Sequence, residues 1–69
     1  MKLEHIFQKA TDGMTVVSPS VPDQILRAVK NPFEDRVDWL RYYKNDVMSP
    51  QVASFTAKDF RRDDYEVKP

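Results

Sequence analysis

Five prolines divide this chain into short segments, and they limit its folding choices more than any other sequence feature. A proline lacks a backbone N–H donor and disfavours the helical conformation of the residue before it. Regular elements are therefore expected to be short. With 69 residues in total, the sequence is long enough for one domain at most.

A domain of this size has a small hydrophobic core, and the sequence offers no covalent help. A chain this short buries only about 60% of the surface that its unfolded form exposes. The absence of cysteine excludes disulfides, cysteine-based zinc and iron–sulfur sites, and any thiol nucleophile. No cofactor is expected, and the missing thiols are consistent with a reducing compartment.

The charge balance narrows the class of partner. Eleven basic and eleven acidic residues cancel, which argues against a dedicated nucleic-acid binder and a polybasic membrane anchor. No stretch approaches 18 consecutive apolar residues, so no membrane span is expected. The first ten residues lack the apolar run of a signal peptide, and we therefore expect a cytoplasmic protein.

The first part of the chain has a helical pattern followed by an extended one. Apolar residues at helical spacing predict a helix over residues 2–11. Gly13 is the only glycine in the chain, and we expect it in a helix C-cap or a tight turn. Residues 14–18 are rich in β-branched side chains and are expected to be extended.

Capping patterns predict helices in the rest of the chain. The Ser-Val-Pro-Asp sequence at residues 20–23 predicts a helix to about residue 30. Asn31 followed by proline predicts the N-cap of a second helix over residues 32–44, ended by Asn45-Asp46. Ser49-Pro50 predicts a further helical region to residue 60, with a second capping box at residues 56–59.

Together these patterns predict a mostly α fold, a small bundle of three to four short helices. Residues 1–60 would form a single compact helical domain, and residues 61–69 a charged C-terminal tail that becomes ordered only by docking. Alternating apolar and charged residues in that tail indicate a strand over 64–68. It would pair with 14–18 as a minor two-stranded ribbon, or add to a sheet edge of another protein.

Few residues suggest catalysis or metal binding. His5, the only histidine, is expected to face solvent on the outer side of the first helix, and no glycine-rich turn or nucleophile motif accompanies it. Asp35 and Asp38 would share a helix face with Glu34 nearby. We interpret these carboxylates as offsetting the helix dipole rather than as metal ligands. No catalytic, cofactor or metal residue is therefore assigned.

The aromatic residues of segment 32–44 indicate a binding surface. As a helix, this segment would have one apolar stripe containing Phe33, Val37 and Leu40 and a second containing Trp39 and Tyr42. Trp39 would either fill the core or join the second stripe in an interface. The candidate partner-binding residues are Trp39, Tyr42, Tyr43, Arg36, Phe60 and Tyr65.

We therefore expect a small, non-catalytic protein-binding module or an accessory or regulatory subunit, of a kind that phages and mobile elements often encode. It would act through the aromatic helix face and the tail, on another protein or by forming a homodimer. The alternative is a small nucleic-acid-binding regulator that uses the basic and aromatic residues of 32–44 together with Arg61 and Arg62.

Overall fold

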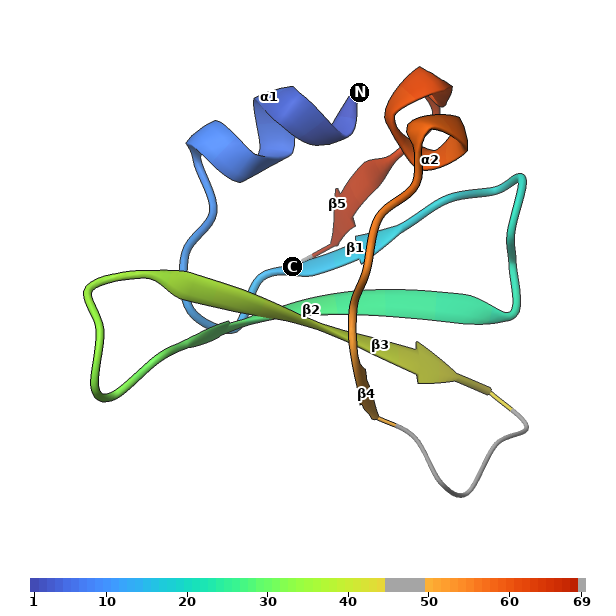
Figure 1. The fold of residues 1–69 in the computed structure, drawn as a ribbon. Coiled ribbons are helices and arrows are strands. Elements are labelled where there is room, and N and C mark those ends of the chain that lie inside the picture. The colour runs from blue at the N-terminus through green and yellow to red at the C-terminus, as the bar shows by residue number, and fades with distance from the viewer. Residues whose placement is uncertain (45–49, 69) are drawn as a thin grey trace.

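One antiparallel sheet with two short helices over one of its faces forms the protein (Figure 1), as described for residues 1–44 and 50–68 by a computed structural model. The five strands lie in the order β4-β3-β2-β1-β5, and every described pairing is antiparallel. In chain order the elements are α1 (Leu3–Gln8), β1 (Thr15–Val17), β2 (Gln24–Lys30), β3 (Val37–Tyr43), β4 (Gln51–Val52), α2 (Ala57–Arg61) and β5 (Glu66–Lys68).

The predicted helical bundle is wrong, because the two central predicted helices are strands. Segment 20–30 contains β2 and segment 32–44 contains β3, and the two strands pair along their whole length from Gln24↔Tyr43 to Lys30↔Val37. Their apolar residues fit a helical spacing, but valine, isoleucine, tryptophan and tyrosine also favour strands. Pairing in a long hairpin satisfies the backbone of both segments at once.

A turn replaces the helix start that was predicted after Asn31. The side-chain oxygen of Asn31 accepts hydrogen bonds from the backbone N–H groups of Phe33 (2.8 Å) and Glu34 (3.2 Å). The Asn31 N–H donates to the Arg36 carbonyl at 2.9 Å and closes the turn. An asparagine that caps a helix and one that begins a turn make the same kind of local bond, so the sequence pattern alone does not separate them.

The predicted element after Pro50 is divided between a strand and a helix. Gln51 and Val52 form β4 against β3, and α2 begins only after Thr56. The Thr56 N–H donates to the Asp59 carboxylate at 2.9 Å, as the predicted capping box at 56–59 requires. The predicted limits at Ser49 and at Asn45-Asp46 lie outside the described residues.

The N-terminal predictions are confirmed in type. The helix over 2–11 is present as the shorter α1, and segment 14–18 contains β1. Gly13 has φ +86° and lies between them. Its N–H donates to the Ala28 carbonyl (2.8 Å), while the Ala28 N–H donates to the Met14 carbonyl (2.9 Å). Two residues therefore oppose one, which is a β-bulge with glycine in the left-handed position.

Pairing between β1 and β5 was one of the two alternatives for the C-terminal segment, and it is the one observed. Val16 lies opposite Val67, at one edge of the five-stranded sheet rather than in a separate ribbon. The predicted tail, residues 61–69, thus docks on its own chain through residues 66–68, whereas residue 69 lies outside the described part.

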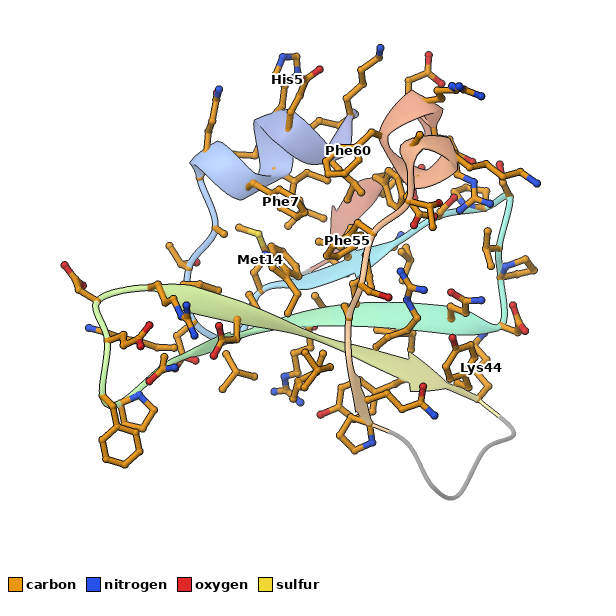
Figure 2. All side chains as sticks on the ribbon, viewed as in Figure 1. His5, Phe7, Met14, Lys44, Phe55 and Phe60 are labelled. Atoms are coloured by element: carbon orange, nitrogen blue, oxygen red, sulfur yellow. The ribbon has the colours of Figure 1, made fainter. Side chains whose placement is uncertain are left out.

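The hydrophobic core lies between the helices and the sheet. Leu3 and Ile6 of α1 are fully buried against Val16 and Leu26 of the sheet, and Tyr65 completes the buried cluster. Phe7 packs on this cluster with Trp39 and Phe55, at ring-centroid distances of 5.4 and 5.2 Å (Figure 2). Within the described residues, α1 and α2 have six and five residues, and neither is long and apolar enough to cross a bilayer.

Replacement of Gly13 tests the bulge. Gly13→Ala is expected to lower the free energy of unfolding by about 1–2 kcal/mol, because a Cβ disfavours positive φ. No atom lies within 4 Å of the added Cβ, so the whole effect comes from the backbone. Urea unfolding measures it. Gly13→Asn is the matched control and should cost less, since asparagine tolerates this conformation. Equal stability of all three proteins would contradict the assigned bulge.

Candidate functional site

The register of the sheet assigns each side chain to one of two faces. Residues directly opposite each other in an antiparallel pair point to the same side. Val16, Leu26 and Arg41 form one such row and face the helices, where Val16 and Leu26 are buried. Neighbouring residues along each strand therefore point to the opposite side. Both helices lie over the first face (Figure 1), and no described helix or strand covers the second.

We call this second side the open face. One row across it contains Val17, Ile25 and Tyr42, with Glu66 on β5. The next contains Thr15, Arg27, Leu40 and Val52, with Lys68 on β5, and Val29 lies opposite Asp38 in a third row. The name open face is used for seven of these residues, Val17, Ile25, Arg27, Val29, Leu40, Tyr42 and Val52, and Asp38, Glu66 and Lys68 add charge at its margins.

The open face combines apolar side chains with one central cation. Val52 is 82% exposed and Val29 is 37% exposed. Arg27 is exposed between them and makes no ion pair with a described residue. Arginine and tyrosine are the residue types that carry much of the binding energy at protein interfaces. The face thus has the composition of an interface, with Arg27 in its middle row and Tyr42 in the row at one end.

The structure separates the residues that the sequence grouped as a binding surface. Trp39 and Phe60 lie on the helix side, where both rings pack on Phe7, with centroids 5.4 and 6.1 Å away. Figure 2 shows Phe60 beside Phe7. Tyr65 is buried in the core, so for Trp39 and Tyr65 the contacts are internal. The predicted stripe that joined Trp39 to Tyr42 does not exist, because two residues three positions apart on a strand point to opposite faces of the sheet.

The other three predicted residues occupy three different places. Tyr42 lies on the open face. Tyr43 ends β3 opposite Gln24. Arg36 lies in the turn between β2 and β3, where its guanidinium pairs with Glu34 (2.9 Å) and Asp38 (3.2 Å). The acidic residues assigned to a helix dipole therefore serve a turn instead, and that interpretation was wrong.

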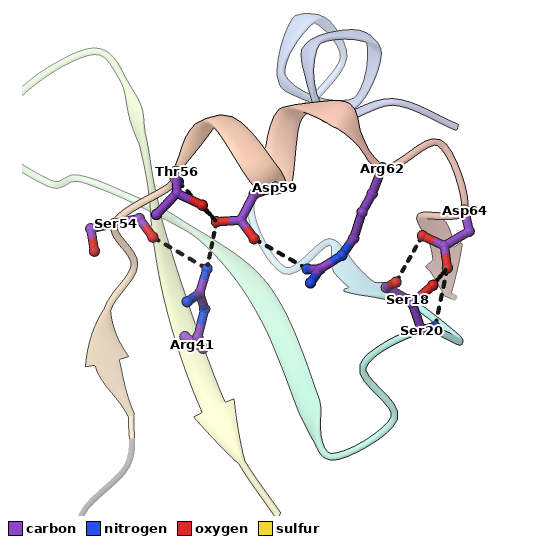
Figure 3. Close-up of polar contacts among 8 residues, drawn as sticks. All are labelled: Ser18, Ser20, Arg41, Ser54, Thr56, Asp59, Arg62 and Asp64. Atoms are coloured by element: carbon purple, nitrogen blue, oxygen red, sulfur yellow. Dashed lines mark hydrogen bonds and ion pairs between the residues drawn. The ribbon is translucent and has the colours of Figure 1, made fainter.

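A polar cluster joins α2 to the sheet on the covered side (Figure 3). One oxygen of the Asp59 carboxylate lies 3.1 Å from Arg62, and the other lies 3.8 Å from Arg41 of β3. Arg41 also donates to the Ser54 carbonyl at 3.3 Å, and its guanidinium lies 5.5 Å from the Phe55 ring centroid. The Asp59–Arg62 pair is local to α2, whereas the contacts of Arg41 fix α2 and the segment before it on β3.

A second part of the cluster joins the C-terminal segment to the loop after β1. The Asp64 carboxylate accepts hydrogen bonds from the Ser18 hydroxyl (2.8 Å), the Ser20 N–H (3.1 Å) and the Ser20 hydroxyl (Figure 3). The two hydroxyls, Ser20 first, hold the pKa of Asp64 below its ordinary value of 3.8. Ser20 therefore binds a distant carboxylate and does not cap the helix predicted after it.

The polar cluster encloses only a small cavity. The cavity beside Arg41, Asp59 and Arg62 has a volume of about 20 Å³, enough for about one water molecule. His5 is exposed on the outer side of α1, as predicted, and points away from the sheet (Figure 2). Within residues 1–44 and 50–68, no three histidine or carboxylate side chains gather as a metal site would require.

Sequence reasoning missed most of the open face, although a signal for it was present. Residues 25–29 form a short apolar run interrupted only by Arg27, and such a run fits a strand as well as a helix. The proline-marked capping patterns favoured the helix there. Leu40 was assigned to a core stripe and now lies on the uncovered side of β3.

Because of the hydrogen bonds to Asp64, the free energy of unfolding is expected to depend on pH in the acidic range. Because the folded-state pKa is lowered, the stabilisation is present above the unfolded-state value and is lost as the pH falls through the folded-state value. Asp64→Asn should therefore unfold at lower urea than the parent protein at pH 7, and the difference should shrink at about pH 2.5. Asp63→Asn, beside it and exposed, is the control and should show little change. A difference that is equal at both pH values would contradict the assignment.

Comparison with known proteins reveals no relative of this chain. No protein-family model matches it, and no curated protein or solved structure matches it significantly. Functional inference for this protein therefore depends on the geometry of its own residues.

Proposed function

We propose that this protein is a non-catalytic protein-binding module, an accessory or regulatory subunit that docks through its open face. The observation that carries the proposal is the group of six apolar and aromatic side chains around Arg27 on the open face, which no described element covers. A sheet is stable when its apolar faces are packed against another layer. A partner protein would supply that layer here.

The position of Arg27 favours a different protein over a symmetric pair of this chain. In a face-to-face dimer with its axis at the centre of the open face, the two Arg27 side chains would approach each other and repel. A partner that places a carboxylate opposite Arg27 would instead gain a charge-assisted hydrogen bond inside an apolar surround. We therefore specify the partner as a protein with an apolar surface patch that carries an acidic group.

Three of the five basic residues that the nucleic-acid alternative would use are already paired within the chain. Arg36, Arg41 and Arg62 all make ion pairs with carboxylates of the same chain. A nucleic-acid surface needs cations that are free to neutralise phosphates, and these three are occupied. A cytoplasmic location remains part of the proposal, supported by the absence of cysteine from the sequence.

Charge reversal on the open face tests the proposal. Tagged parent protein, Arg27→Glu and Val52→Asp are purified from source cells with their bound proteins, which are quantified by mass spectrometry. Both substitutions alter exposed side chains, so the fold should persist. We expect one protein to be lost with both variants and, after purification, to bind Arg27→Glu at least about tenfold more weakly by calorimetry, as for an interface hot spot.

Lys58→Glu is the matched control for that experiment. Lys58 is an exposed residue of α2 on the opposite side of the sheet, and the variant should keep the partner at parental affinity. Circular dichroism confirms that each variant is folded. The proposal would be wrong if every bound protein were retained by both open-face variants, or lost equally with Lys58→Glu.

A further inference from the structure

The turn between β2 and β3 holds one aromatic ring in solvent. Phe33 is 94% exposed, although its backbone is fixed by the Asn31 side chain. Arg36 braces the same turn through its ion pairs with Glu34 and Asp38. An ordered turn that presents an exposed aromatic residue has already lost the conformational freedom that binding would otherwise remove. We call residues 31–36 the tip.

A groove of about 240 Å³ lies at the other end of the hairpin. Its floor is apolar, with Val17 and Ile25 from the open face and two prolines from the loop after β1. Small-molecule sites usually exceed about 300 Å³, so the volume suits a single side chain better than a metabolite. The groove is lined by Val17, Ser18, Pro19, Pro22, Ile25, Lys44, Glu66 and Lys68.

The tip and the groove are complementary in charge as well as in polarity. In the tip, Glu34 pairs with Arg36, which leaves Asp35 as the excess negative charge. The groove is bordered by Lys44, Lys68 and Glu66, and the Lys68–Glu66 pair (3.4 Å) leaves Lys44 as the excess positive charge. Among the described residues, neither Asp35 nor Lys44 has an ion-pair partner. A ring placed in the groove by an acidic turn would bring these unpaired charges together.

One molecule is unable to fill its own groove. The groove lies at the start of β2 and the tip follows its end, so the seven residues of β2 separate them (Figure 1). At about 3.3 Å per residue this is roughly 20 Å of extended strand. Figure 2 shows Lys44 at the end of the hairpin away from the turn. A tip that enters this groove must therefore come from a second molecule.

We propose that the tip of one copy binds the groove of another, with Phe33 in the groove and Asp35 beside Lys44. The proposal rests on the proposed function, because the groove is one end of the open face, and it names a second copy as a partner there. Such a head-to-tail contact uses different surfaces on the two molecules. It therefore leaves one tip and one groove free, and association should increase with concentration.

Two complementary variants isolate a single contact. Phe33→Ala removes the tip but keeps the groove, and Lys44→Glu disables the groove but keeps the tip. ¹⁵N-labelled Phe33→Ala protein is titrated with unlabelled Lys44→Glu protein and followed by amide chemical shifts. We expect shifts around Val17 and Ile25, saturating with a Kd of about 0.1–1 mM, because one anchor and exposed ion pairs give weak binding.

Charge exchange supplies the control. The Lys44→Glu titrant that also carries Asp35→Lys should bind the labelled Phe33→Ala protein at least about tenfold more weakly. Binding of this double variant should be restored when the labelled protein carries both Phe33→Ala and Lys44→Glu. The proposal would be overturned if the shifts persisted with a titrant that carries both Lys44→Glu and Phe33→Ala, or if no shifts appeared up to about 2 mM titrant. Neither result affects open-face binding of a different protein, which is tested at Arg27 and Val52.

Discussion

The side of the sheet that the helices cover depends on the contacts of one carboxylate, that of Asp59. It binds the backbone at the start of α2 and lies close to two arginines, one on the helix side and one on β3. A helix of five residues is too short to be stable by itself. Charge-assisted contacts to the sheet therefore hold α2 in place and, with it, the aromatic side chains that surround Phe7.

Placing both helices on one side has a direct consequence for the other. The core is formed by a few residues of α1, β1 and β2 together with Tyr65, and it uses only half of the sheet's side chains. The remaining half contains β-branched and aromatic residues that strands favour. They give the open face an apolar area around Arg27, and the proposed binding role follows from that uncovered area rather than from any reactive group.

Short-range features of the fold were predicted from the sequence, and long-range ones were not. The turn at Gly13, the box at Thr56 and Asp59, and the extended segment at 14–18 each depend on a few neighbouring residues. The helices predicted over 20–30 and 32–44 were wrong because a short apolar run fits both periods. For the candidate site, only Tyr42 was correctly placed away from the core stripe, whereas Arg27 was not considered.

The sequence by itself determined that the elements are short, that the chain turns at Gly13, and that thiol chemistry is absent. These properties depend on proline, glycine and cysteine, whose effects are local or covalent. Only the tertiary structure decided that residues 24–30 and 37–43 are strands, that Asp64 meets Ser18 and Ser20, and that one face of the sheet stays open. A strand exists only through hydrogen bonds to another strand, and such a partner can be distant in the sequence.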